Sequence, residues 1–130
     1  MLGYVGAIEK LTLDNRNFRE VLYTGPHAQL VLMCLQPGEE IGEEVHKSVD
    51  QFFRLEHGEA KFILNKSEIS VARSGDAVVV PAGTIHNVVN SSKTAQLNLY
   101  TIYSPPNHPP GTVHATKADA TAAEHHEVAR

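Results

Sequence analysis

Residues 75–90 read GDAVVVPAGTIHNVVN, which follows the pattern Gly75-x5-Pro81-x-Gly83-x2-His86-x3-Asn90. Glycine tolerates positive φ and proline restricts φ, so these residue types at this spacing are typical of tight turns. Two short runs of strand-forming residues, 77–80 and 86–90, stand on either side of the Pro-Ala-Gly turn. The stretch therefore predicts two short β-strands joined by a turn, with a histidine at the start of the second strand.

A second cluster precedes it, with the pattern Gly38-x5-Glu44-x-His46-x4-Gln51-x6-Gly58. Residues two apart on a strand share one face, so Glu44 and His46 are expected to point inward while Glu43 and Val45 point away. By the same parity, Gln51 lies on the face of Phe53 and Leu55, and His86 on that of Val88 and Asn90.

Together the two clusters resemble the two signatures of the cupin family, G-x5-H-x-H-x3-4-E-x6-G and G-x5-P-x-G-x2-H-x3-N. The downstream cluster matches at every fixed position; the upstream cluster keeps the spacing but has Glu44 in place of the first histidine and Gln51 in place of the glutamate. The resemblance implies an all-β fold, a double-stranded β-helix or jelly-roll cupin barrel, with a short C-terminal extension.

Turn signals break the middle of the chain into short pieces that suit antiparallel strands. Further strands are expected at 28–35, 62–64, 69–72 and 96–103, with the pair 62–64 and 69–72 forming a hairpin around Asn65-Lys66. We expect residues 1–115 to form a single barrel domain that includes a proline-rich lid segment, 104–111. Residues 116–130 are expected to form a C-terminal tail or a short helix over 120–128, with Asp119 as N-cap.

The composition and charge of the chain argue against several classes of function. The 130 residues carry a formal net charge of -4 and hold no run of Lys or Arg, which argues against nucleic-acid binding. With Cys34 alone, neither an intramolecular disulfide nor a zinc ribbon can form. No apolar stretch approaches the ~18 residues of a membrane span and no secretory leader is recognisable, so we expect no membrane association and a cytoplasmic protein.

The resemblance implies one divalent metal ion in the barrel mouth, held by Glu44, His46, Gln51 and His86 on adjacent strands. The two departures from the signature conserve formal ligand charge, because Glu44 adds a carboxylate and Gln51 removes one. Two imidazoles with one carboxylate suit Fe(II), and Mn, Ni or Zn are competitors. Glu44 is either a direct ligand or a general acid/base beside the ion. Gln51 binds the ion weakly, through water, or contacts only the substrate.

The leading functional expectation is a metal-dependent enzyme acting on a small polar substrate such as a sugar or sugar acid, similar to mannose-6-phosphate isomerase-type cupins. The alternatives are an Fe(II)-dependent dioxygenase and a non-catalytic small-molecule binding or sensing module. Two further histidines, His108 and His114, either enter the site from the lid segment or belong to a tail that covers an edge strand. We also expect a homodimer, because an open jelly roll leaves edge strands to cover.

Overall fold

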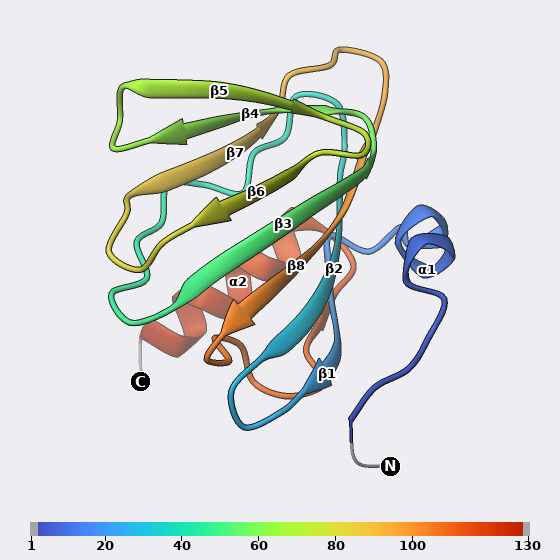
Figure 1. The fold of residues 1–130 in the computed structure, drawn as a ribbon, viewed down its shortest axis with the longest axis vertical. Coiled ribbons are helices and arrows are strands. Elements are labelled where there is room, and N and C mark those ends of the chain that lie inside the picture. Colours follow the sequence, from blue (N-terminus) through green and yellow to red (C-terminus); the bar gives the residue numbers. More distant parts are fainter. Residues whose placement is uncertain (1–2, 129–130) are drawn as a thin grey trace.

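The computed structural model describes residues 3–128, and side chains as far as residue 124. This part of the chain forms nine strands and two helices (Figure 1). The elements are α1 (Ile8–Asp14), β1 (Arg19–Thr24), β2 (Gln29–Leu35), β3 (Asp50–His57), β4 (Glu59–Leu64), β5 (Glu68–Arg73), β6 (Ala77–Val80), β7 (His86–Asn90), β8 (Leu97–Ser104), β9 (Val113–His114) and α2 (Lys117–Val128).

The strands form two antiparallel sheets with the core between them. The larger sheet has the order β6-β3-β8-β2-β1-β9, and the smaller has the order β5-β4-β7 (Figure 1). Phe53 of β3 and Phe62 of β4 meet edge to face across the interior, with ring centroids 5.1 Å apart, and both side chains are fully buried. Burial alternates along β3, as expected for strands with one face on a core. The expected all-β jelly-roll fold is confirmed.

Most of the predicted strands are found close to their predicted places. The two strands on either side of the Pro81–Gly83 turn have the predicted bounds, β6 and β7. The predicted hairpin is β4 paired with β5, and its turn contains Asn65 and Lys66 at φ angles of 49° and 70°. Asn-containing turns of this kind match the twist of the flanking strands. At the other end of β4, Gly58 has φ 98°, and a Cβ added there would lie 2.8 Å from the Gln96 carbonyl oxygen.

The expectation that Glu44 and His46 lie on a regular strand is wrong. Segment 36–49 follows β7 through isolated bridges, Glu40 with Val89 and Glu44 with His86, rather than through a continuous ladder. Gly42 is supported by a side chain instead, because its N–H donates to Asn87 Oδ1 over 2.9 Å. The predicted alternation of faces still holds, since Glu43 and Val45 are exposed while Glu44 and His46 are half-buried.

Two elements near the N-terminus, α1 and β1, lack a sequence prediction. The N-cap position of α1, Ala7, offers no side-chain hydrogen bond. The helix is instead fastened to the sheet by Asn98, whose amide donates to the carbonyl oxygens of Thr12 (3.1 Å) and Asn15 (3.0 Å). A seven-residue helix is marginal alone, so this tertiary contact explains why local signals do not mark it.

The C-terminal helix begins earlier than predicted, and Asp119 is not its N-cap. Thr116 Oγ1 accepts from the Asp119 N–H (3.1 Å), and the Thr116 N–H donates to Asp119 Oδ2 (3.3 Å). This reciprocal pair is a capping box in which Thr116 is the cap and Asp119 lies three residues further on.

Within residues 3–128, the structure contains no helix long and apolar enough to cross a membrane. Apolar side chains are exposed on the edge strands β5 and β6, at Ile69, Val71 and Val79. The homodimer and the cytoplasmic location stay predictions.

Candidate metal centre and adjoining pocket

Backbone hydrogen bonds join the two sequence clusters at the barrel mouth. The Gly83 N–H donates to the His46 carbonyl (2.8 Å), and Glu44 and His86 exchange both backbone hydrogen bonds at 2.8 Å. The Ala82 N–H donates to Asp50 Oδ1 at the start of β3. The turn in the downstream cluster therefore holds both ends of segment 44–50 beside β7, which brings the four predicted donor residues into one region.

Gln51 on β3 and His86 on β7 face one another from opposite sheets, so their strands are not adjacent as predicted. The distance from Gln51 Oε1 to His86 Nε2 is 3.2 Å, and both residues are buried. Thr101 fixes the orientation of the amide: its hydroxyl donates to the Phe52 carbonyl (2.8 Å) and so accepts from Gln51 Nε2 (3.0 Å). The Gln51 oxygen is therefore the atom that points at the imidazole.

His86 has an oxygen on each ring nitrogen. Nδ1 lies 3.0 Å from the Thr84 carbonyl oxygen, while Nε2 faces Gln51 Oε1. A neutral imidazole carries only one N–H. When Nδ1 donates to Thr84, Nε2 carries no hydrogen, so its lone pair faces a lone pair of Gln51 Oε1. A cation bound by both atoms would remove this repulsion. A backbone carbonyl on the outer nitrogen is also the usual support of a metal-binding histidine.

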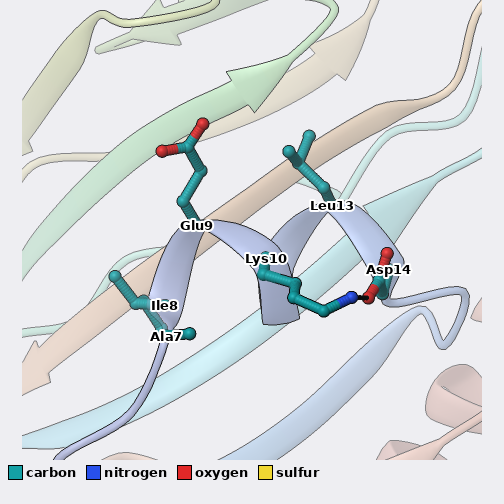
Figure 2. A pocket seen from close by; sticks show the side chains of 6 residues that line it. All are labelled: Ala7, Ile8, Glu9, Lys10, Leu13 and Asp14. Carbon is teal, nitrogen blue, oxygen red and sulfur yellow. Dashed lines mark hydrogen bonds and ion pairs between the residues drawn. The ribbon is translucent and has the colours of Figure 1, made fainter.

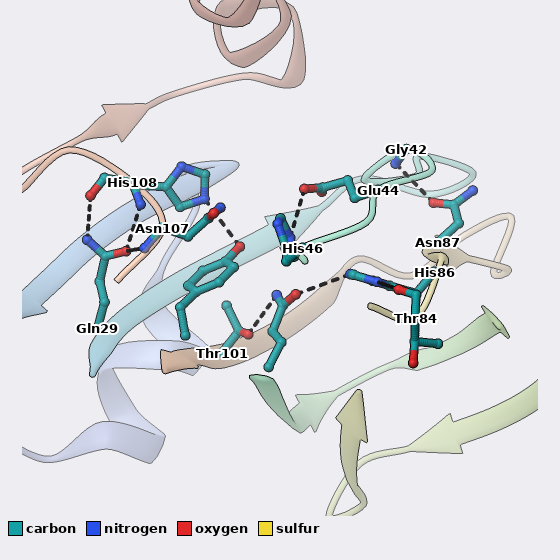
Figure 3. Close-up of polar contacts among 12 residues, drawn as sticks. Gln29, Gly42, Glu44, His46, Thr84, His86, Asn87, Thr101, Asn107 and His108 are labelled. Atoms are coloured by element: carbon teal, nitrogen blue, oxygen red, sulfur yellow. Dashed lines mark hydrogen bonds and ion pairs between the residues drawn. The ribbon is translucent and has the colours of Figure 1, made fainter. Parts of the chain in front are cut away.

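Glu44 and His46 form the second donor pair. His46 Nε2 lies 3.2 Å from Glu44 Oε2, with side-chain exposures of 11% and 27% (Figure 3). The contact lacks hydrogen-bond geometry, and His46 Nε2 is a buried nitrogen without a hydrogen-bond partner in the part of the chain that the structure describes. Leaving a buried polar atom without a hydrogen bond costs about 1–3 kcal/mol. A bound metal ion would supply the missing partner of this nitrogen.

The two pairs lie side by side, with the His46 and His86 ring centroids 5.4 Å apart. Cis ligands at about 2.1 Å from an ion are separated by about 3.0 Å, close to the 3.2 Å within each pair. Among the described side chains, no group of three His, Cys, Asp or Glu is arranged to hold a metal ion. The donor set therefore depends on the Gln51 amide and on the two pairs coming together around the ion, and the chemistry of these four donors fits a divalent ion.

Electrostatics keep Glu44 ionised. Burial alone would raise the pKa of this carboxyl, but the polar contact with His46 and the charges of His46, Arg19 and His86 hold it below its usual range. Tyr103 is fully buried beside His46, with ring centroids 5.8 Å apart. Burial, followed by the Glu44 charge, raises the pKa of the Tyr103 hydroxyl, so it stays protonated.

The proline-rich segment lies beside the donors, and the short strand β9 that follows it pairs with β1. His108 Nε2 lies 3.2 Å from the Tyr103 hydroxyl, and burial, then the Arg19 charge, lowers the pKa of His108 to about 4. His114 lies on β9, which pairs with the edge strand β1. His108 and His114 both line a hollow that Glu44 also lines, and their functional role stays a prediction.

Gln29 fastens this segment to β2. The fully buried Gln29 side chain accepts from the N–H groups of Asn107 (3.1 Å) and His108 (2.9 Å) and donates to the His108 carbonyl (2.7 Å). Its amide nitrogen also donates to Thr24 Oγ1. One side chain therefore fixes the start of the segment over the mouth (Figure 3).

We expect Gln29→Met to lower the free energy of unfolding by about 1–3 kcal/mol, because it leaves the backbone groups of residues 107 and 108 unsatisfied. Urea denaturation followed by circular dichroism measures the change. The matched control is Gln36→Met, since Gln36 is exposed and its side chain makes no hydrogen bond within the described part of the chain. Equal midpoints for the two variants would contradict the role of Gln29.

Two hollows adjoin the donors and share Glu44 and Glu124. One, of about 400 Å³, follows residues 41–46 at the open side of the mouth. The other, of about 160 Å³, lies under the proline-rich segment and α2. Its lining residues are Arg19, Glu44, Asn107, His108, Pro109, Thr112, His114, Ala123 and Glu124.

A third hollow, of about 530 Å³, follows the outer side of α1 and shares no residue with the donors (Figure 2). All of its lining residues lie between Ala7 and Asp14. Its polar side chains include an exposed ion pair, Lys10 with Asp14 at 2.7 Å. An open groove along one helix with such a solvated pair offers no convergent polar groups.

Five apolar side chains of β2, β3, β7 and β8 are fully buried core: Met33, Phe53, Val88, Leu97 and Leu99. Arg54 pairs with Glu56 at 3.0 Å, and by the alternation along β3 it lies on the opposite face from Gln51. Asn90 donates to the carbonyls of Leu35, Gln36 and Ala95, so this motif residue holds loops.

Three residues of the site were missed from the sequence: Arg19, Gln29 and Thr101. The alternation of faces along β8 could have identified Thr101, because this residue lies between Leu99 and Tyr103 on the inward face of the strand. Arg19 lies at the start of a strand that lacked a prediction.

Comparisons with known proteins agree with this geometry. The family model described as "Cupin domain" matches residues 31–103. The chain is 51% identical over 126 residues to the uncharacterized protein YrkC of Bacillus subtilis (strain 168), covering 93% of this chain and 67% of YrkC. The crystal structure of BH2720 from Bacillus halodurans superposes with a TM-score of 0.89 at 45% identity, covering 92% of this chain and 93% of that one.

More distant structures share the fold alone. One is described as a predicted oxalate decarboxylase from Thermotoga maritima, with a TM-score of 0.56 and 20% identity, covering 60% of this chain and 66% of that one.

Proposed function

The chain belongs to the cupin family, and we propose that it is a metal-dependent enzyme acting on a small polar substrate such as a sugar or sugar acid. The reaction we propose is isomerisation or related carbonyl chemistry. One divalent ion, Fe, Mn, Ni or Zn, would be held by Glu44, His46, Gln51 and His86.

The pairing of donors carries this proposal. His46 Nε2 is buried without a hydrogen-bond partner among residues 3–124 and lies beside the Glu44 carboxylate, while Gln51 Oε1 points at His86 Nε2. Thr84 and Thr101 orient the second pair from outside. A purely structural cluster would be expected to satisfy its own polar atoms.

When bound, such an ion polarises a carbonyl or a pair of hydroxyl groups. The ionised Glu44 carboxylate would take the proton from the hydroxyl-bearing carbon beside the carbonyl and return it to the carbonyl carbon, while the proton of that hydroxyl group passes to the carbonyl oxygen. Tyr103 and Phe53 wall the inner side and exclude water. Glu44 lines both open hollows, so a substrate in either one reaches this carboxylate.

The test is exchange of substrate carbon-bound hydrogen with D2O, followed by NMR without oxygen, for a panel of aldoses and uronic acids. We expect exchange with protein loaded with Mn, Ni or Zn. Glu44→Gln is expected to lower its rate by about 10²-fold or more, the usual contribution of a general base. Glu68→Gln is the matched control, because Glu68 is exposed on β5 and lines neither of the two hollows beside Glu44.

The metal content of each variant separates loss of the ion from loss of the base. Oxygen uptake that requires iron and substrate, without anaerobic exchange, would identify a dioxygenase instead. Binding without exchange under any condition would leave a binding module.

A further inference from the structure

The buried Arg19 guanidinium is not used by the proposed chemistry. Arg19 is 2% exposed and points to the inside of the barrel from the first residue of β1. Its Nε is a buried atom without a hydrogen-bond partner in the described structure. A guanidinium has five N–H donors in a planar fork that matches a carboxylate.

No carboxylate in the described part of the chain lies within ion-pair distance of Arg19. The ion pairs there involve other residues. The guanidinium of Arg19 lies 3.4 Å from His114 Nδ1 and 5.3 Å from the centroid of the Phe18 ring. A buried charge without a partner is costly, and buried charges are normally paired. Among the described residues, Arg19 therefore has no carboxylate partner for its buried charge.

Arg19 lines the 160 Å³ hollow together with donors and acceptors of the proline-rich segment. A water molecule takes about 30 Å³ of liquid, so the hollow has room for about five waters, which suits the end of a small molecule. The wider 400 Å³ hollow has Glu44 and Glu124 among its lining residues too. A molecule with one end at Arg19 therefore lies in the same hollow as the Glu44 carboxylate, one of the four proposed metal donors.

We propose that this hollow binds the carboxylate group of the substrate through Arg19, so that the substrate is a hydroxy or oxo carboxylic acid rather than a neutral sugar. The proposal rests on the proposed function in one respect, because a bound ion would neutralise the Glu44 carboxylate that lines this hollow. A monoanion fits better than a phosphate dianion, since Glu44 and Glu124 also line the hollow and repel a second negative charge.

The first experiment is calorimetric titration of the wild-type protein, loaded with redox-silent Zn, with L-lactate and with its uncharged amide, lactamide. The two probes share shape and hydroxyl group but differ in charge. We expect lactate to bind about ten-fold or more tightly than lactamide, because only lactate can form a bidentate pair with a guanidinium.

The second experiment repeats both titrations on variants whose metal content has been measured. Arg19→Gln is expected to raise the Kd of lactate about ten-fold and to leave that of lactamide unchanged. Arg19→Lys, which keeps the charge but loses the fork, is expected to weaken lactate binding less. Arg73→Gln is the matched control, because Arg73 is 67% exposed and pairs with Glu59 on the small sheet.

The outcomes separate this inference from the proposed function. Equal affinities for lactate and lactamide in the wild-type protein would overturn the carboxylate site, even if Arg19→Gln failed to fold. Metal binding with lactate affinity unaffected by Arg19→Gln would overturn it while leaving the metal centre standing. A lactate preference that depends on Arg19 in a protein that takes up no metal would support the carboxylate site and reject the proposed enzyme.

Discussion

Replacement of His86 by alanine is expected to lower the affinity for a divalent ion by more than about 100-fold. The imidazole is held by Thr84 at Nδ1 and directs Nε2 at Gln51 Oε1, so its removal takes away a pre-oriented ligand and the partner of the amide. Loss of a supporting residue around a ligand already costs about 10- to 100-fold, and loss of the ligand itself costs more. Competition with a chromophoric chelator measures the affinity.

The control for this prediction is His27→Ala, because His27 is exposed and lies outside the two clusters. Circular dichroism of both variants shows whether the barrel has kept its strands. Unchanged affinity in a folded His86→Ala protein would mean that His86 is a structural histidine and that the ion, if any, binds elsewhere.

The second large effect concerns the core. We expect Phe53→Ala to lower the free energy of unfolding by about 3–5 kcal/mol, the usual cost of truncating a buried phenylalanine. Phe53 is fully buried and contacts Phe62 of the opposite sheet and the ring of His86, with centroids 5.1 and 6.4 Å away. Urea denaturation gives the change, and a metal titration of the same variant shows whether His86 has lost its support.

Phe52→Ala is the matched control, since the neighbouring Phe52 points to the other face of β3, is half-buried and packs near Tyr100. Its loss should be clearly smaller. Similar losses for the two variants would mean that the interior of the barrel tolerates a cavity at residue 53 and does not depend on this contact between the sheets.

Local signals account for the parts of the fold that the sequence predicts well. The Pro81–Gly83 turn and the Asn65-Lys66 turn depend on backbone preferences of a few residues, so the strands beside them were placed closely. The helix α1 depends on Asn98, which lies more than 80 residues away in the sequence. No pattern within residues 8–14 records that contact.

The sequence predicted which residues form the candidate site, but not how they are arranged in space. Parity gives the face on which Gln51 and His86 lie, but it does not say that their strands belong to opposite sheets. Glu44 and His46 alternate as a strand would, although they belong to an irregular segment beside β7. The burial of Arg19 could not be predicted from the sequence, because it depends on the pairing of β1 with β9, which only the folded chain shows.

The most direct test of the metal centre is elemental analysis of the protein purified without an affinity tag. His125 and His126 lie where side chains are not described, and a His125→Ala, His126→Ala double variant removes any metal that this pair binds. The account predicts about one Fe, Mn, Ni or Zn per chain in the wild type and in the double variant, lost in His46→Ala. Absence of metal, with no uptake when each ion is added, would contradict it.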